Sequence, residues 1–153
     1  PVAVNEIAQQ AYVADIHEPV KYTLHETPGK EGKPAIRYAS SELVEEERWG
    51  LLSAIDLSNG KIKWQQKIEQ PLIGGVLATA GGLLFTGEGN GNFNAFDTDN
   101  GTLLWQAKSD AGVNAPPITY EIDGVQYVAV AAGGNSIFGY KQGDNVLVYK
   151  LAQ

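Results

Sequence analysis

The chain has 153 residues, of which 43% are hydrophobic and 19% charged, and its formal net charge is −7. This composition is typical of a folded globular domain and excludes extensive disorder. The acidic balance, without any run rich in Lys or Arg, excludes nucleic acid as a partner. Cysteine is absent, which excludes disulfides and thiolate metal sites. No apolar run reaches the ~20 residues of a membrane span.

Two stretches repeat the same residue types at the same offsets. AIDLSNGKIKW occupies residues 54–64 and AFDTDNGTLLW occupies residues 95–105, which places the second copy 41 residues after the first. A period of this size indicates a solenoid, a propeller or another array. The 18 Gly and 7 Pro residues, set among aromatic and β-branched residues, favour many short strands with tight turns. The predicted fold is therefore all-β, a partial β-propeller.

The strands can be assigned to blades in chain order. The first four-stranded blade is expected from residues 1–7, 10–16, 49–57 and 61–68. The second is expected from residues 74–82, 83–91, 92–101 and 102–108. Residues 116–124, 125–134 and 145–153 give three strands of a third blade that lacks its fourth. We expect about three blades of a larger ring, cut from a longer chain and ending at its true C-terminus.

Residues 17–48 interrupt the first blade. The segment is polar and rich in Pro, Gly and charge, which predicts a long surface loop with a short helix at SSELVEEE, residues 40–47. His17 and His25 each precede a glutamate, but no third ligand is in register, so a surface loop is favoured over a metal site. The acidic run at 45–47 is expected to be a solvated face.

The repeat has a mechanical interpretation. Its aspartate can accept backbone N–H groups of the following turn, and its Asn-Gly pair supplies the positive φ angles of that turn. Its tryptophan is expected to be buried in the seam between two adjacent blades. The residues concerned are Asp56, Asn59, Gly60 and Trp64 in the first copy and Asp97, Asn100, Gly101 and Trp105 in the second.

Together with three further stretches, this repeat resembles the C-terminal part of the pyrroloquinoline quinone (PQQ) dependent dehydrogenases. The stretches are PLIGGVLATAGGLLFTG (71–87), TYEIDGVQYVAVAAGG (119–134) and the ending NSIFGYKQGDNVLVYKLA (135–152). Members of that family are eight-bladed propellers, and their repeats are called tryptophan docking motifs. The resemblance runs from about Trp49 to the last residue. It is closest to the membrane-type glucose and quinate dehydrogenase branch.

The resemblance implies an enzyme of the periplasm. Such enzymes oxidise an alcohol, sugar or polyol with PQQ held over Ca²⁺, and pass the electrons to a quinone or cytochrome acceptor. In the family the catalytic Asp, the Ca²⁺ ligands and the basic residue over the quinone belong to blades before residue 1. This chain alone is therefore expected to be inactive and to hold no metal ligand.

The chain's partners are expected to be the remainder of the propeller, or further copies that associate through open blade faces. Any membrane association would come from segments N-terminal to this chain. A second hypothesis is a cofactor-free propeller that serves as an interaction scaffold. Residues 124–153 favour the enzyme, because a scaffold would need only the docking motif.

Four residues are candidates for contact with the cofactor: Ile73, Gly74, Asn114 and Asn135. Ile73 stands where alcohol-oxidising members have a Trp floor, and Gly74 allows close backbone approach. Asn135 stands where the sugar branch has a His, and it can form hydrogen bonds but cannot act as a base. Each also has a plain structural interpretation, as core, channel lining or a turn residue. GEGNGN, residues 87–92, lacks the following helix of a phosphate loop.

Overall fold

The computed structural model describes residues 2–44 and 47–150, and the regular structure of these residues consists of β-strands. The chain divides into two compact units. One is formed by the chain up to His17 and from Trp49 onward, and the other by Glu18–Arg48.

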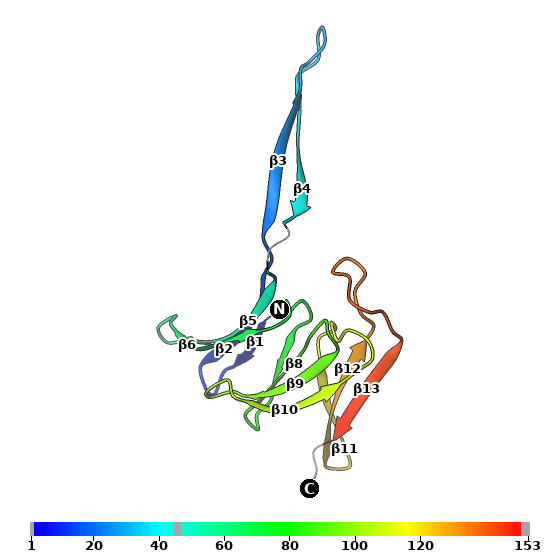
Figure 1. Ribbon diagram of the computed structural model, residues 1–153. Helices are drawn as coiled ribbons and strands as arrows, with labels where there is room; N and C mark the ends of the chain where they lie inside the picture. The colour runs from blue at the N-terminus through cyan, green and yellow to red at the C-terminus, as the bar shows by residue number, and fades with distance from the viewer. Residues whose placement is uncertain (1, 45–46, 151–153) are drawn as a thin grey trace. The chain divides into compact units, whose positions relative to one another are not determined.

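The first unit consists of three antiparallel sheets that lie side by side (Figure 1). Sheet 1 has the order β1 (Val2–Asn5), β2 (Gln10–His17), β5 (Trp49–Asp56) and β6 (Ile62–Ile68). Sheet 2 has the order β7 (Val76–Ala78), β8 (Leu83–Gly87), β9 (Asn92–Asp97) and β10 (Leu103–Lys108). Sheet 3 has the order β11 (Ile118–Ile122), β12 (Val125–Ala132) and β13 (Asn145–Lys150). This arrangement of adjacent, unclosed blades confirms the predicted fold class.

The two central strands of sheet 2, β8 and β9, are buried on both faces, whereas β10 is largely exposed. Successive side chains of a strand point to opposite faces, so neighbouring residues of β8 enter different cores. Leu84 packs with Tyr12 and Leu52 of sheet 1, whereas Phe85 packs with Val128 and Val130 of sheet 3. The middle sheet therefore holds the outer two together.

The first strands of the sheets mark the edge at which the sheets converge. β7 contacts both β1 and β2 of the neighbouring sheet. Segments that enter these first strands are accordingly brought close to one another. Candidate site residues that precede β7 and β11 are placed at this converging edge.

The repeated turn forms as the sequence predicts, with one difference. Asp56 Oδ1 accepts hydrogen bonds from the backbone N–H (2.8 Å) and hydroxyl (2.6 Å) of Ser58. These bonds lower the pKa of Asp56. Only the glycine of each Asn-Gly pair has positive φ, 72° at Gly60 and 74° at Gly101. Asn59 instead contributes its Oδ1, which accepts from the N–H of Lys61.

Trp64 ties sheet 1 to the turn of sheet 2, as expected for a seam residue. Its Nε1–H donates to the carbonyl oxygen of Thr98 at 2.9 Å. A Cβ built on Gly101 would lie 2.6 Å from Cε3 of the indole, so only glycine leaves room for the ring. The large apolar ring and its single donor are both satisfied by one neighbouring turn.

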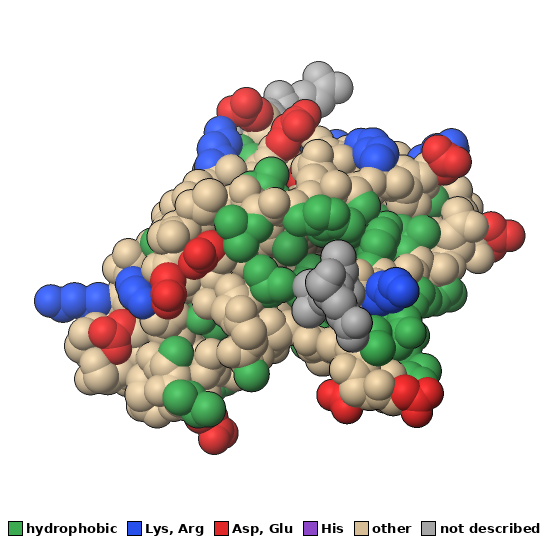
Figure 2. Space-filling view, turned by 90° about the horizontal axis from the view of Figure 1, so that it is seen from below, with side chains coloured by type: hydrophobic (Ala, Val, Ile, Leu, Met, Phe, Trp, Pro, Cys, Tyr) green, Lys and Arg blue, Asp and Glu red, His purple; other side chains and the backbone are tan. Residues whose placement is uncertain are grey.

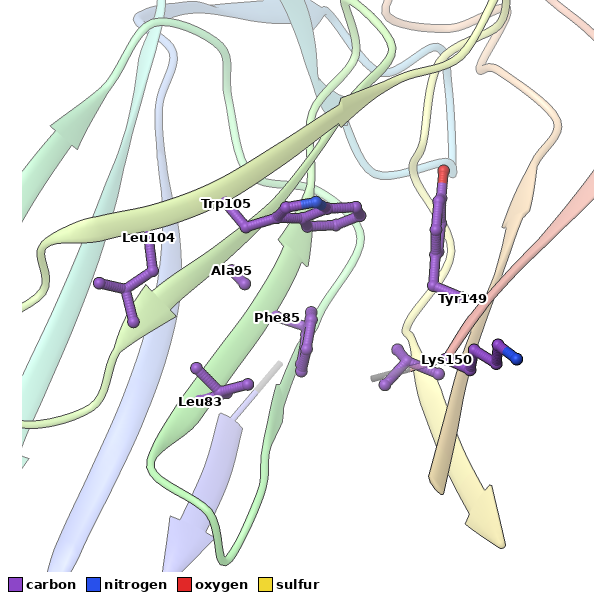
Figure 3. Close-up of a pocket in the computed structure, with 8 residues that line it drawn as sticks. Leu83, Phe85, Ala95, Leu104, Trp105, Tyr149 and Lys150 are labelled. Carbon is purple, nitrogen blue, oxygen red and sulfur yellow. The ribbon is translucent and has the colours of Figure 1, made fainter. Parts of the chain in front are cut away.

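The prediction that Trp105 is buried is wrong, because its side chain is 40% exposed. The ring packs edge-on against Tyr149, with centroids 4.9 Å apart, and against Phe93. The rings of Trp105 and Tyr149 border an apolar cleft of about 430 Å³ between sheets 2 and 3 (Figure 3). The turn that follows β9 in sheet 2 covers Trp64 of sheet 1. The equivalent turn in sheet 3 would follow β13, and the described residues of sheet 3 contain no such turn to cover Trp105.

The second unit corrects the expectation for residues 17–48. Instead of an irregular loop it is a two-stranded antiparallel ribbon of β3 (Val20–Thr27) and β4 (Ile36–Leu43). The short helix expected at 40–47 is wrong for 40–43, which lie in β4, and residues 45 and 46 lie outside the described residues. The alternation of Tyr, Thr, Leu and Val with polar residues, a strand pattern, overrides the helix-forming glutamates here.

The Trp64 contact predicts different costs for two equivalent glycines. Gly60→Ala must place a side chain at φ 72° but meets nothing within 4 Å, so it should cost only the backbone strain of about 1–2 kcal/mol. Gly101→Ala carries the same strain and also displaces the indole, which should add about 1–3 kcal/mol. Urea unfolding monitored by far-UV circular dichroism measures both. Equal midpoints for the two variants would contradict the docking role of Trp64.

Candidate functional site

The structure brings three of the four candidate residues to the converging edge of sheets 2 and 3. Gly74 precedes β7, and Asn114 precedes β11. A Cβ built on Gly74 would lie 3.0 Å from the carbonyl carbon of Asn114 and 3.1 Å from its oxygen. The two segments are therefore in close backbone contact, which the absence of a side chain at position 74 favours. Ile73, partly buried, adds an apolar side chain next to this contact.

Asn135 belongs to a loop that is pinned to the Asn114 segment by backbone hydrogen bonds. The N–H of Gly134 donates to the oxygen of Gly112, and the N–H of Gly112 donates to the oxygen of Lys141, each at 2.9 Å. Gly134 has a φ of 69°, which glycine adopts without strain. The loop from 133 to 143 and the segment from 111 to 115 consequently form one rigid corner.

The side chain of Asn135 is largely committed to its own turn. Its Oδ1 accepts from the backbone N–H of Ile137 (3.0 Å) and of Phe138 (3.2 Å). Its backbone exchanges hydrogen bonds with Tyr140. The turn alone explains an asparagine here, and the Nδ2 group is the part of the side chain that a ligand could use.

Asn114 carries the clearest signal of the four residues. Both of its side-chain polar atoms are buried, and neither has a hydrogen-bond partner among the described residues. An unpaired buried amide costs about 1–3 kcal/mol, and native proteins keep few of them. A partner atom is therefore expected from a ligand, a water molecule or a segment outside this chain. This orphaned amide could not be predicted, because hydrogen-bond satisfaction depends on tertiary contacts.

A buried carboxylate that the sequence analysis missed supports the same corner. Glu88 is 4% exposed, and its side chain accepts hydrogen bonds from the amides of Asn90, Asn92 and Asn94. Its backbone oxygen accepts from the N–H of Val113 at 3.0 Å. The i, i+2 spacing of Asn92 and Asn94 was an available signal, because such residues share one face of a strand. GEGNGN is thus a turn braced by its own side chains.

Tyr140 was also missed, and it closes the corner over Gly89. A Cβ on Gly89 would meet the Tyr140 ring at 2.2–2.4 Å, so the ring lies flat against a glycine backbone. Phe138 stacks on Tyr140 with centroids 5.8 Å apart. An aromatic pair and an unpaired amide therefore share the end of the sheets at which β8 and β12 finish.

Two features are absent from residues 2–44 and 47–150, the part of the chain that the structure describes. Among these residues no group of three or more His, Asp or Glu side chains is arranged to hold a metal ion. The same part of the chain contains no helix with the length and apolar character needed to cross a bilayer.

The three-sheet architecture, with Trp64 packed on the turn of the next sheet, is found in a known protein family. The model described as "PQQ: Glucose/ethanol/alcohol dehydrogenase, beta-propeller domain" matches residues 6–128. This chain belongs to the PQQ dehydrogenase propeller family. It is 50% identical over 84 residues to the quinoprotein ethanol dehydrogenase of Pseudomonas aeruginosa, covering 55% of this chain and 14% of that protein. It is 36% identical over 123 residues to the quinoprotein glucose dehydrogenase of Escherichia coli, covering 67% and 16%.

Solved structures of the PQQ dehydrogenase family share the fold over nearly the whole chain. The quinohemoprotein alcohol dehydrogenase from Comamonas testosteroni matches with a TM-score of 0.78 and 28% identity, covering 98% of this chain and 25% of that one. Quinohemoprotein alcohol dehydrogenase ADHIIG from Pseudomonas putida matches with a TM-score of 0.81 and 26% identity, covering 99% and 26%. The chain is thus a partial fragment, about a quarter of these proteins. Because both alcohol and glucose dehydrogenases match, the glucose/quinate branch stays a prediction.

The orphaned amide predicts contrasting effects for two asparagines. Asn114→Ala removes polar atoms that have no partner, so its free energy of unfolding should stay within about 1 kcal/mol of the parent value. Asn94→Ala is the matched control, because its Nδ2 binds Glu88 and its Oδ1 accepts from Gln106. Leaving the buried carboxylate short of a donor should cost about 2–3 kcal/mol. Denaturant unfolding measures the free energy of unfolding of both variants. A loss of stability in Asn114→Ala larger than about 1 kcal/mol would show that its amide is paired.

Proposed function

We propose that this chain forms part of a periplasmic PQQ-dependent dehydrogenase that oxidises an alcohol, sugar or polyol. Bound PQQ would accept two electrons from the substrate and release them to a quinone or cytochrome acceptor. The observation that carries the proposal is the unpaired Asn114 amide at the converging edge, in a chain of this family. One relative, from P. putida, is a quinoprotein alcohol dehydrogenase, and another, from a Pseudomonas species, is a lupanine 17-hydroxylase whose name includes cytochrome c.

The candidate residues can supply only some of the contacts that the cofactor would need. A planar quinone with polar groups at its rim needs apolar surface against its face and hydrogen-bond donors at its edge. Ile73 offers the apolar side chain, and the amides of Asn114 and Asn135 offer donors. Gly74 acts indirectly, because it brings the Asn114 backbone into place. We propose that the acidic and metal-binding groups, including those for Ca²⁺, come from parts of the enzyme outside these residues.

Because the acidic and metal-binding groups are proposed to lie outside these residues, we predict that the 153-residue chain alone binds neither PQQ nor Ca²⁺ tightly and is inactive. Tryptophan fluorescence should stay flat during titration with PQQ up to high micromolar concentration, with and without Ca²⁺. Tight stoichiometric binding would show that the fragment contains a complete site.

The Asn114 assignment is tested in the longer dehydrogenase that contains this chain. There Asn114→Ala should weaken PQQ binding at least about tenfold, as expected for the loss of one buried hydrogen bond of ~1.4 kcal/mol. Asn59→Ala, in a turn of sheet 1 remote from the edge, is the control and should leave PQQ affinity unchanged. Unaltered affinity in Asn114→Ala would remove this residue from the site while leaving the enzyme class open.

The open sheets also predict association of the isolated chain. Large apolar side chains reach the surface on sheets 1 and 3, among them Val4 (54%), Ile118 (59%) and Val146 (71%), and Figure 2 shows hydrophobic groups exposed on one face of the molecule. In the described chain β13 is the edge of sheet 3, and an unpaired edge can add a strand. Sedimentation should show dimers, higher oligomers or aggregates, reduced by Val146→Lys. A stable monomer at tens of micromolar would contradict the partial-ring interpretation.

A further inference from the structure

Residues 87–89, with the sequence Gly-Glu-Gly, are packed between the two segments that form the corner. A Cβ built on Gly87 would overlap with the carbonyl oxygen of Val113, and one built on Gly89 would overlap with the ring of Tyr140. Both glycines therefore lie too close to the corner to be replaced by a larger residue. Glu88, between them, carries a side chain that is buried.

The Glu88 carboxylate is fixed by amide donors, and none of the salt bridges of the described residues involves it. Its Oε1 accepts from Nδ2 of Asn94 at 2.5 Å and of Asn92 at 3.4 Å, and its Oε2 accepts from Nδ2 of Asn90 at 3.3 Å. Asn92 in turn accepts from Lys108 Nζ through its Oδ1 at 3.0 Å. A buried carboxylate held by such a network has one favourable position, because a displacement would leave its charge unpaired.

The backbone of Glu88 extends this fixed position to the residue before Asn114. The carbonyl oxygen of Glu88 accepts from the N–H of Val113, which is fully buried, at 3.0 Å. A Cβ built on Gly112 would lie 2.7 Å from Nδ2 of Asn114 and 2.9 Å from the carbonyl oxygen of Gly89. The orphaned amide of Asn114 therefore lies beside the turn that Glu88 holds.

The amide network is not required by the repeated fold. At the offset of the repeat, sheet 1 has Leu51 and Ser53 in place of Asn92 and Asn94, and it still forms the equivalent strand pair, β5 with β6. A buried charge without a cationic partner costs stability. A charge that the strand pair does not need, placed in the sheet that borders the corner, indicates a role at the corner.

We propose that Glu88 is a positioning residue, which holds Asn114 in place for contact with the cofactor without touching the cofactor. This inference rests on the proposed function, in which Asn114 contacts PQQ. The effect passes from the carboxylate to the turn, from the carbonyl oxygen of Glu88 to Val113, and so to Asn114. A binding group that is displaced slightly loses much of its contact, so the groups that fix it contribute to binding.

Glu88→Gln in the longer dehydrogenase that contains this chain tests the link to the corner. The variant keeps the shape of the side chain but replaces one acceptor oxygen with an NH₂ group. That group finds no free acceptor, because the amide oxygens of Asn90 and Asn92 are already engaged. Hydrogen exchange followed by mass spectrometry should therefore show amides of residues 111–115 exchanging at least about threefold faster than in the parent.

Ser53→Ala is the matched control for loss of stability. Ser53 is buried at the position of sheet 1 that is equivalent to Asn94, and its Oγ accepts from Gln65 Nε2 at 2.8 Å. The control should leave both exchange at 111–115 and PQQ affinity unchanged.

PQQ affinity measures the positioning role itself. Glu88→Gln should weaken PQQ binding about three- to tenfold, because the Asn114 hydrogen bond is misaligned but not removed. In the Asn114→Ala background the same substitution should have no further effect, since a positioning residue acts through its target. A residue that only stabilises the fold would give the same loss in both backgrounds. Asn92→Ala repeats the cycle if Glu88→Gln does not fold.

Three results would overturn the inference. Unchanged exchange at 111–115 in Glu88→Gln would show that the carboxylate does not hold the corner. Weaker PQQ binding in Asn114→Ala, with either no loss in Glu88→Gln or an equal loss in both backgrounds, would reject the positioning role while keeping Asn114 in the site. Unchanged PQQ affinity in both single variants would reject it together with the assignment of Asn114.

Discussion

The contact between the Trp64 indole and the turn of the next sheet is the constraint on which the arrangement of sheets 1 and 2 depends. The ring lies against Gly101 and donates to the carbonyl oxygen of Thr98, so one side chain satisfies shape and hydrogen bonding together. Because the turn is built from the same Asp and Asn-Gly residues in both copies, the contact can recur from blade to blade. Trp105 shows that burial of the indole depends on this neighbouring turn, since Trp105 has no such turn against it and is 40% exposed.

The stacking of sheets has a direct consequence for the candidate site. Sheets that converge at their first strands bring the segments before β7 and β11 into contact, and glycine at position 74 allows their backbones to touch. The loop after β12 is then fixed to the same corner through Gly112 and Gly134. A rigid corner with one unsatisfied amide is suited to orienting a ligand, because little reorganisation is needed on binding.

The corner and the ribbon each contain groups in an unusual environment. At the corner the Asn114 amide has no partner among the described residues, and on the ribbon large apolar side chains such as Tyr22 and Leu24 are exposed. Both are costly in water, one by desolvation and the other by exposed apolar area.

The sequence by itself determined the local elements of this protein. The 41-residue repeat, the Asn-Gly turns and the alternating apolar runs predicted the strands of three blades and the family, because these signals depend on neighbours close in the chain. Only the tertiary structure decided which groups lack a partner or cover. Asn114 and Asn135 look alike in sequence, yet one amide is orphaned and the other caps its own turn. Residues 40–43 carried helix-forming glutamate, but pairing with β3 made them a strand. Burial and hydrogen-bond satisfaction are set by contacts between distant segments, and no local pattern encodes them.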